Sequence, residues 1–125
     1  MSHVNELAEY LKSQGYEAVQ TEASELRVLH PSLPVYLLVE FRDNFAYMSI
    51  KHSEELREVL EDLRDDYEDV EGIVEEALSY LSLASLKVRM WVEERGYTSV
   101  FKLRDGSIEI YEILEEVLEE REEEA

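Results

Sequence analysis

One stretch of the chain, residues 69–96, constrains the fold more than any other. Its apolar residues recur in steps of four and three, the spacing of one face of an α-helix. Further apolar residues widen that face until only a thin polar stripe remains, so other elements or a second subunit must cover this helix. The spacing fits a coiled-coil seam as well as a monomer core, and we favour the core. The face comprises Val70, Val74, Ala77, Leu81, Ala84, Val88 and Trp91, widened by Ile73, Leu78, Tyr80, Leu83, Leu86, Met90 and Val92.

The sequence pattern before this helix predicts one short helix followed by four strands. Residues 4–14 carry apolar side chains at helical spacing, and Gly15 stands where a C-terminal cap belongs. Residues 16–21 and 25–30 alternate as strands, and the prolines of residues 30–34 make a rigid connection to the next strand. Residues 35–51 then predict a hairpin.

The register of this hairpin follows from its pattern. A two-residue turn at Asp43 and Asn44 gives one entirely apolar face, whereas a three-residue turn would mix Ser49 and Lys51 into it. We therefore predict the two-residue turn. It pairs Phe41 with Ala46, Val39 with Met48 and Leu37 with Ile50, and leaves an outer face of Tyr36, Leu38, Glu40, Arg42, Phe45, Tyr47, Ser49 and Lys51.

The rest of the chain is mostly helical. Residues 54–67 predict an amphipathic helix with Ser53 as its N-cap, and Asp69 is the expected N-cap of the long helix. Residues 98–104 predict a strand that closes at Asp105 and Gly106. Residues 107–111 fit either a returning strand or the start of a helix that runs from about residue 109.

The predicted fold class is therefore α+β: an N-terminal helix, a four-stranded antiparallel β-meander packed against helices, and an extra C-terminal strand or hairpin with a helix. We expect residues 1–96 to form the sheet-and-helix domain. We expect residues 97–125 to mediate the assembly of the chain into a homo-oligomer. The predicted oligomerisation stripe is Ile110, Ile113, Leu114, Val117 and Leu118.

The charge is large and uneven. The chain has 31 acidic and 12 basic residues, a formal net charge of −19. Residues 1–52 hold seven acids and four bases, so most of the negative charge lies after the predicted sheet. Many charged residues with few Asn and Gln and no Cys suit a hyperthermophile, whereas a halophile would be expected to use more Asp.

Several function classes are disfavoured. The chain has no Cys, no phosphate-binding glycine loop and no paired metal motif, so we expect no enzyme activity, no metal and no cofactor. His3, His30 and His52 are expected to be ordinary surface histidines. There is no signal-peptide pattern and no apolar run long enough for a membrane, which predicts a cytoplasmic protein without a membrane partner.

The outer face of the hairpin is the main functional indication. Aromatic rings interleaved with cations on strands are typical of proteins that stack the bases of single-stranded DNA or RNA. The large negative charge opposes this interpretation, because phosphate contacts supply most non-specific affinity. The alternative is that a helix, the C-terminal segment or a partner covers the face. The predicted nucleic-acid-binding residues are Tyr36, Phe45 and Tyr47 as stacking platforms and Arg42, Lys51 and Arg27 as phosphate contacts.

The order of elements, together with the composition, resembles the N-terminal domain of ThermoDBP and the ThermoDBP-related proteins of hyperthermophilic archaea over about residues 4–95. This resemblance implies binding of single-stranded DNA through the sheet and oligomerisation through C-terminal elements. The same order is similar to that of type III secretion chaperones and YbjN-like proteins, acidic dimers that bind other proteins. A protein-binding chaperone-like adaptor is therefore the alternative function.

Overall fold

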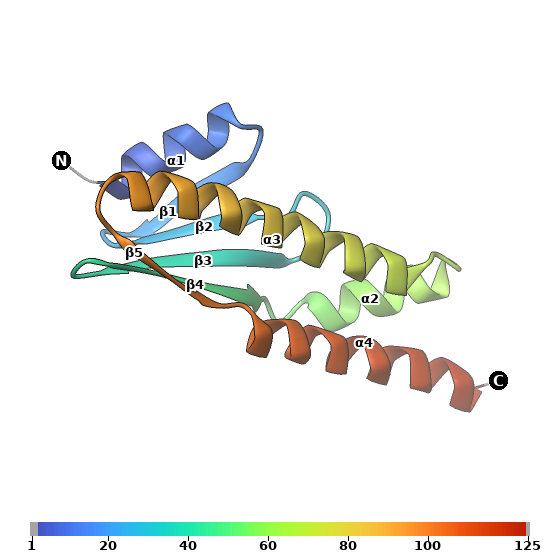
Figure 1. The fold of residues 1–125 in the computed structure, drawn as a ribbon. Coiled ribbons are helices and arrows are strands. Elements are labelled where there is room, and N and C mark those ends of the chain that lie inside the picture. Colours follow the sequence, from blue (N-terminus) through green and yellow to red (C-terminus); the bar gives the residue numbers. More distant parts are fainter. Residues whose placement is uncertain (1–2, 125) are drawn as a thin grey trace.

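The computed structural model describes residues 3–124, with side chains as far as residue 120, and shows four helices and one five-stranded sheet (Figure 1). The predicted segments 1–96 and 97–125 include residues 1–2 and 125, which lie outside the described residues. The α+β class is confirmed. The elements are α1 (His3–Ser13), β1 (Glu17–Glu22), β2 (Glu25–Leu29), β3 (Val35–Arg42), β4 (Phe45–His52), α2 (Leu56–Asp65), α3 (Val70–Glu94), β5 (Thr98–Lys102) and α4 (Arg104–Glu124).

The sheet is mixed. β1 to β4 are antiparallel and adjacent in chain order, as predicted, and β5 adds to the other side of β4 as a parallel strand. Parallel neighbours need a crossover connection, which α2 and α3 provide. The C-terminal strand is thus the fifth strand of the same sheet, and the hairpin considered for this segment does not form, since the chain enters α4 directly after β5.

The predicted hairpin register is confirmed. Phe41 pairs with Ala46 and Val39 with Met48, and Arg42 pairs with Phe45 across the turn. Asp43 takes a φ of 55°, which a short polar side chain tolerates well. The inner face of β2 to β4 is consequently apolar and fully buried, and it consists mainly of Leu26, Val28, Val35, Leu37, Val39, Ala46, Met48 and Ile50.

Two helices cover the inner face of the sheet, α1 over β1 and β2 and α3 across the centre (Figure 1). The seven apolar residues spaced from Val70 to Trp91 are buried, so the core interpretation of this helix is confirmed. The wider apolar face is only partly buried, because Leu83, Leu86 and Met90 are exposed. The carboxylate of Asp69 caps α3 by accepting from Gly72 N–H at 3.1 Å, as predicted. Gly96 ends the turn after α3 with a φ of 86°.

Two predicted helix boundaries are wrong. Ser53 is not the N-cap of α2; Glu55 holds that position without a side-chain cap bond, and Leu56 N–H donates to the Ser53 carbonyl instead. Asp105 and Gly106 do not close a turn, because they lie in the first turn of α4. A Cβ at Gly106 would lie 1.9 Å from the carbonyl oxygen of Ile50, so the helix approaches β4 more closely than any other residue would allow.

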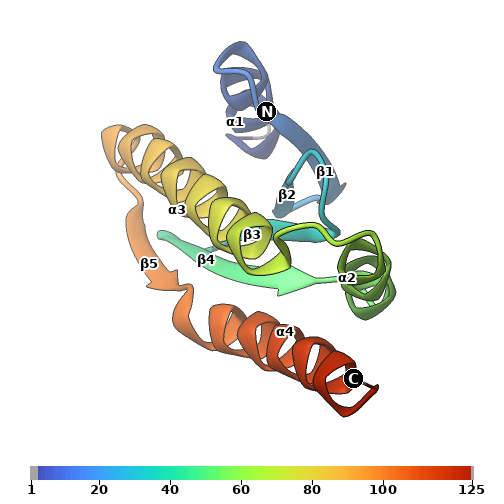
Figure 2. The same cartoon turned by 90° about the vertical axis from the view of Figure 1, so that its right-hand side faces the viewer.

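The helix α4 packs against β4 and α2 and extends past the end of the sheet (Figures 1 and 2). Ile110, Leu114 and Val117 are buried in the same core as the rest of the chain, with Ile113 and Leu118 packed at its margin. The oligomerisation stripe predicted from the sequence is therefore already covered within one chain. An oligomerisation role for residues 97–125 stays a prediction.

Ionic contacts join α2 to α4. Arg57 contacts Glu116 and Glu120, while the buried Arg64 donates to the carbonyl oxygen of Val117 at 2.9 Å. The hydrogen bond from Arg57 lowers the pKa of Glu120. The pKa of Glu61 is raised, first by its hydrogen bond to Glu120 and then by loss of solvent.

Candidate nucleic-acid interface

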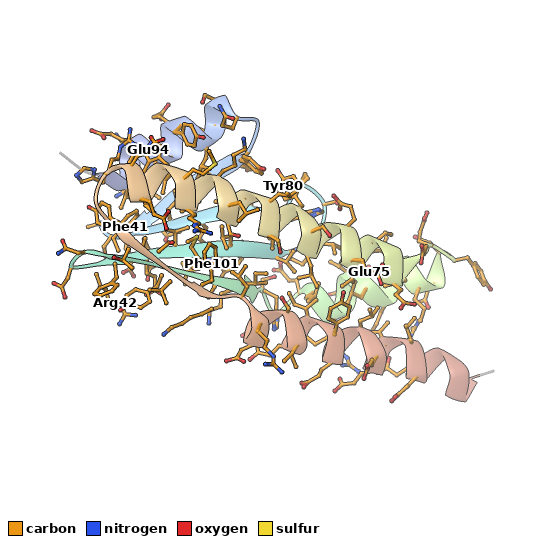
Figure 3. The ribbon with its side chains drawn as sticks, viewed as in Figure 1. Phe41, Arg42, Glu75, Tyr80, Glu94 and Phe101 are labelled. Carbon is orange, nitrogen blue, oxygen red and sulfur yellow. The ribbon has the colours of Figure 1, made fainter. Side chains whose placement is uncertain are left out.

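The outer face of the sheet is open. Because α1 and α3 both lie on the inner side, no helix of the described residues lies across the outer side of β3 and β4 (Figure 1). Arg42, Phe45 and Lys51 are exposed, and Tyr36 and Tyr47 are half-buried. Figure 3 shows Arg42 on the side of the sheet away from both helices. The N-terminal helix α1 therefore does not cover this face, whereas the C-terminal segment borders it, with Lys102 beside Tyr47 and the start of α4 at a hollow next to it.

Each predicted stacking tyrosine already contacts a cation. The guanidinium of Arg27 lies 4.6 Å from the centre of the Tyr36 ring, and that of Arg42 lies 4.2 Å from the Tyr47 ring. The Phe45 ring lies 5.8 Å from Tyr47. The six predicted residues form one continuous surface over β2, β3 and β4, since Lys51 pairs with Tyr36 across the strands.

Lys102 is a member of this surface that the sequence did not reveal. It pairs with Ser49 through the parallel β4–β5 ladder, so it shares the outer face, and its ammonium lies 5.1 Å from the Tyr47 ring. The alternation within residues 98–104 shows that Thr98, Val100 and Lys102 share a face. Which face that is depends on how β5 pairs, and no local signal gives this.

The outer-face cations differ from most other cations of the chain in having no acidic partner. Elsewhere, Lys12, Arg57, Arg64, Arg89 and Arg95 each form an ion pair with a carboxylate. Among the described residues, none of the outer-face cations Arg27, Arg42, Lys51 and Lys102 forms one, although acids exceed bases by 31 to 12. The outer face therefore carries positive charge that no carboxylate of the described residues pairs with.

This cationic surface also contains acids. Glu25 and Glu40 are directly opposite on β2 and β3, and Glu40 in turn pairs with Tyr47. A shallow hollow of about 220 Å³ lies where β4 and β5 meet the start of α4. Its lining includes Arg42, Tyr47, Lys51 and Lys102, and also Glu40, Asp105 and Glu109. A phosphate bound here would contact several cations, and the carboxylates at its rim would weaken that binding.

Two of the three histidines, His30 and His52, lie close to a glutamate. His30, predicted to be a surface residue, is buried: its Nδ1 accepts from Leu33 N–H at 3.0 Å and its Nε2 lies 3.0 Å from Glu76. His52 lies 3.8 Å from Glu109. Among the side chains that the structure describes, no group of three or more His, Cys, Asp or Glu residues could hold a metal ion. Within residues 3–124, no helix is both long and apolar enough to cross a membrane.

The geometry can therefore do two things chemically: it can present aromatic and guanidinium planes for stacking, and it can pair with anionic groups through unpaired cations.

No family model, no curated protein and no solved structure matches this chain. The resemblance to the ThermoDBP-related proteins stays a prediction.

Proposed function

We propose that this protein is a non-enzymatic module that binds single-stranded nucleic acid, single-stranded DNA in the first instance, on the outer face of its sheet, and that it acts as a homo-oligomer. The observation that carries the proposal is the gathering of Arg27, Arg42, Lys51 and Lys102 around exposed or half-exposed aromatic rings, with no ion pair to any described carboxylate. Bases would stack on the rings or on the guanidinium planes above them, and phosphates would pair with the cations.

The net charge sets the expected strength of binding. A chain at −19 repels a polyanion at long range, and this repulsion is screened beyond about 8 Å at physiological ionic strength. Most of the acids lie after residue 52, and two of these, Asp105 and Glu109, line the hollow beside the outer face. We therefore expect weak binding that depends on local contacts.

The test is a fluorescence anisotropy titration of a labelled single-stranded oligonucleotide. Tyr36→Ala with Tyr47→Ala should raise the dissociation constant by about 30-fold or more, corresponding to about 1 kcal/mol per stacked base. Tyr67→Ala removes an 81% exposed ring from the α2–α3 loop and should leave binding unchanged. A parent protein without any salt-sensitive binding would refute the proposal.

A chaperone-like protein adaptor is the second candidate, because the same face carries aliphatic side chains. Leu29 and Leu38 are half-buried there, and Glu25 and Glu40 add negative charge. An extended basic and apolar peptide would fit such a surface. Capture of one defined polypeptide by the parent protein, lost in the double tyrosine variant and without bound nucleic acid, would favour this candidate.

A further inference from the structure

A patch of large apolar side chains lies on the opposite side of the molecule from the outer face. Leu83 and Met90 are each 59% exposed on α3, and Leu86 is 49% exposed between them. A groove runs beside them between α3 and α4, with β5 at its base, and we call it the α3 groove. It contains Ser79, Ser82 and Leu86 on one wall and Phe101, Leu103 and Tyr111 on the other. Figure 3 labels Glu75 and Phe101 at this groove.

We propose that a second copy of this chain docks on this surface, with its α3 antiparallel to the first. The two-fold axis would pass between the two α3 helices at the level of Ser82 and Leu83. This proposal deepens the homo-oligomer part of the proposed function by naming the interface. It differs from the sequence prediction, because the apolar stripe of α4 is buried within one chain.

The shape of α3 suits pairing with itself. In an antiparallel two-fold pair, residues equally distant from the axis face each other. Leu86 of each copy would then lie opposite the small, exposed Ser79 of the other, and the two Leu83 side chains would meet at the axis. Large side chains in one half of the helix would thus fill the space left by small ones in the other half.

The charges of α3 show the same self-complementarity. Exposed Glu75 and Glu76 lie before the axis, and Lys87 and Arg89 lie after it. The antiparallel arrangement would bring Glu75 near Arg89 of the second copy on one flank and Glu76 near Lys87 on the other. Within the described residues Lys87 has no ion-pair partner, and Arg89 has only the exposed Glu93 at 3.2 Å. A parallel arrangement would instead place acid against acid.

The total charge predicts how this dimer responds to salt. Two chains of −19 repel each other, so added salt should strengthen an association that depends mainly on apolar contact. Binding of nucleic acid at the outer face should weaken with salt. The two activities can therefore be separated in one protein.

The test is sedimentation velocity of the full chain at low and high salt. The parent should sediment near twice its 14.7 kDa mass, more completely at high salt. Leu86→Glu should raise the dimer dissociation constant by at least about 30-fold, as expected for a central contact. Val19→Glu makes the same charge change at a 43% exposed apolar residue on β1 and should leave the dimer intact.

A charge exchange tests the antiparallel geometry. Glu75→Arg and Arg89→Glu should each weaken the dimer, and the two together in one chain should restore it. A parent chain that stays monomeric at both salt concentrations overturns the proposal and leaves the groove to a different partner. A dimer that Leu86→Glu does not weaken overturns it as well. Leu86 lies on α3, on the other side of the sheet from the outer-face residues. Oligonucleotide binding by a monomeric Leu86→Glu chain would therefore leave the proposed function standing when the dimer interface fails.

Discussion

The ammonium of Lys102 lies 5.1 Å from the centre of the Tyr47 ring, and the guanidinium of Arg42 lies 4.2 Å from the same ring centre. Arg42 comes from β3, Tyr47 from β4 and Lys102 from β5, so three strands meet at one ring. The contact depends on the parallel pairing of β5 with β4, which places Val100 beside Tyr47 and Lys102 beside Ser49. The end of the chain thus completes a surface that begins in the hairpin.

Removing this amine should weaken binding measurably. Lys102→Ala should raise the dissociation constant for a single-stranded oligonucleotide by about five- to tenfold and reduce the dependence of log K on log salt by about one unit. Lys12→Ala is the matched control, since Lys12 lies on α1 and pairs with Glu9 at 3.5 Å. Anisotropy titrations over a series of salt concentrations measure both quantities. Equal effects of the two substitutions would show that only the net charge matters.

The acids within the surface should act in the opposite direction. Glu25→Gln with Glu40→Gln removes two negative charges next to the cations and should tighten binding by about three- to tenfold. Glu6→Gln with Glu9→Gln removes the same charge from α1 and should have a much smaller effect, because salt screens distant charges. If both pairs tighten binding equally, the contacts are not on the outer face.

The hairpin could be predicted because its partners are neighbours in the chain. A slip of one residue would have placed Ser49 and Lys51 among the buried side chains, so the pattern allowed one register. The core helix could be predicted equally well, because the apolar side chains from Val70 to Trp91 must be buried in any arrangement of the other elements. The residues of the outer face on β3 and β4 followed from the same register, but the register did not decide whether another element covers them.

Lys102 and Gly106 could not be placed in the same way. The pairing of β5 is decided by contacts across a long crossover, and a parallel edge strand has no turn to reveal its neighbour. The Asp105-Gly106 pair is typical of a turn, yet here Gly106 is needed for the close approach of α4 to Ile50. The burial of Ile110 and Leu114 follows from that approach, so the predicted oligomerisation stripe also depended on information outside its own segment.

A side chain at Gly106 should disrupt this approach. Gly106→Ala should destabilise the protein by about 1–3 kcal/mol despite the higher helix propensity of Ala, because the obstacle is the backbone carbonyl of Ile50, which cannot rotate away. Asp105→Ala, at an exposed neighbour in the same turn, should cost about 1 kcal/mol or less. Chemical denaturation followed by circular dichroism gives both values. A neutral Gly106→Ala would contradict the packing of α4 on β4.

The contact between Glu61 and Glu120 predicts a pH dependence of stability. The pKa of Glu61 is raised in the folded chain, first by its hydrogen bond to Glu120, so the folded state holds this proton more tightly than the unfolded state does. The stabilisation that protonated Glu61 contributes is therefore lost as the pH rises from 4.5, the ordinary pKa of this group, through its raised pKa in the folded chain. Glu61→Gln keeps a hydrogen-bond donor without the charge, and it should raise the melting temperature at neutral pH.

This gain should shrink as the pH falls to 4.5 and below, where Glu61 of the parent is itself protonated. Thermal melts across this pH range measure the difference. Glu112→Gln, an exposed acid on α4, is the matched control and should show no such pH dependence. A gain from Glu61→Gln that persists unchanged in acid would show that the proton of Glu61 is not involved.

The most direct test of the central claim is a titration of the ¹⁵N-labelled protein with a short single-stranded oligonucleotide, followed by amide chemical shifts. Binding at the outer face predicts that the largest shifts lie on β3, β4 and β5, with Tyr36, Tyr47 and Lys102 among them. It also predicts that the amides of α1 and of the exposed side of α3 stay unchanged. Absence of shifts at low salt, or shifts confined to α3 and α4, would contradict the assignment of the outer face as a nucleic-acid interface.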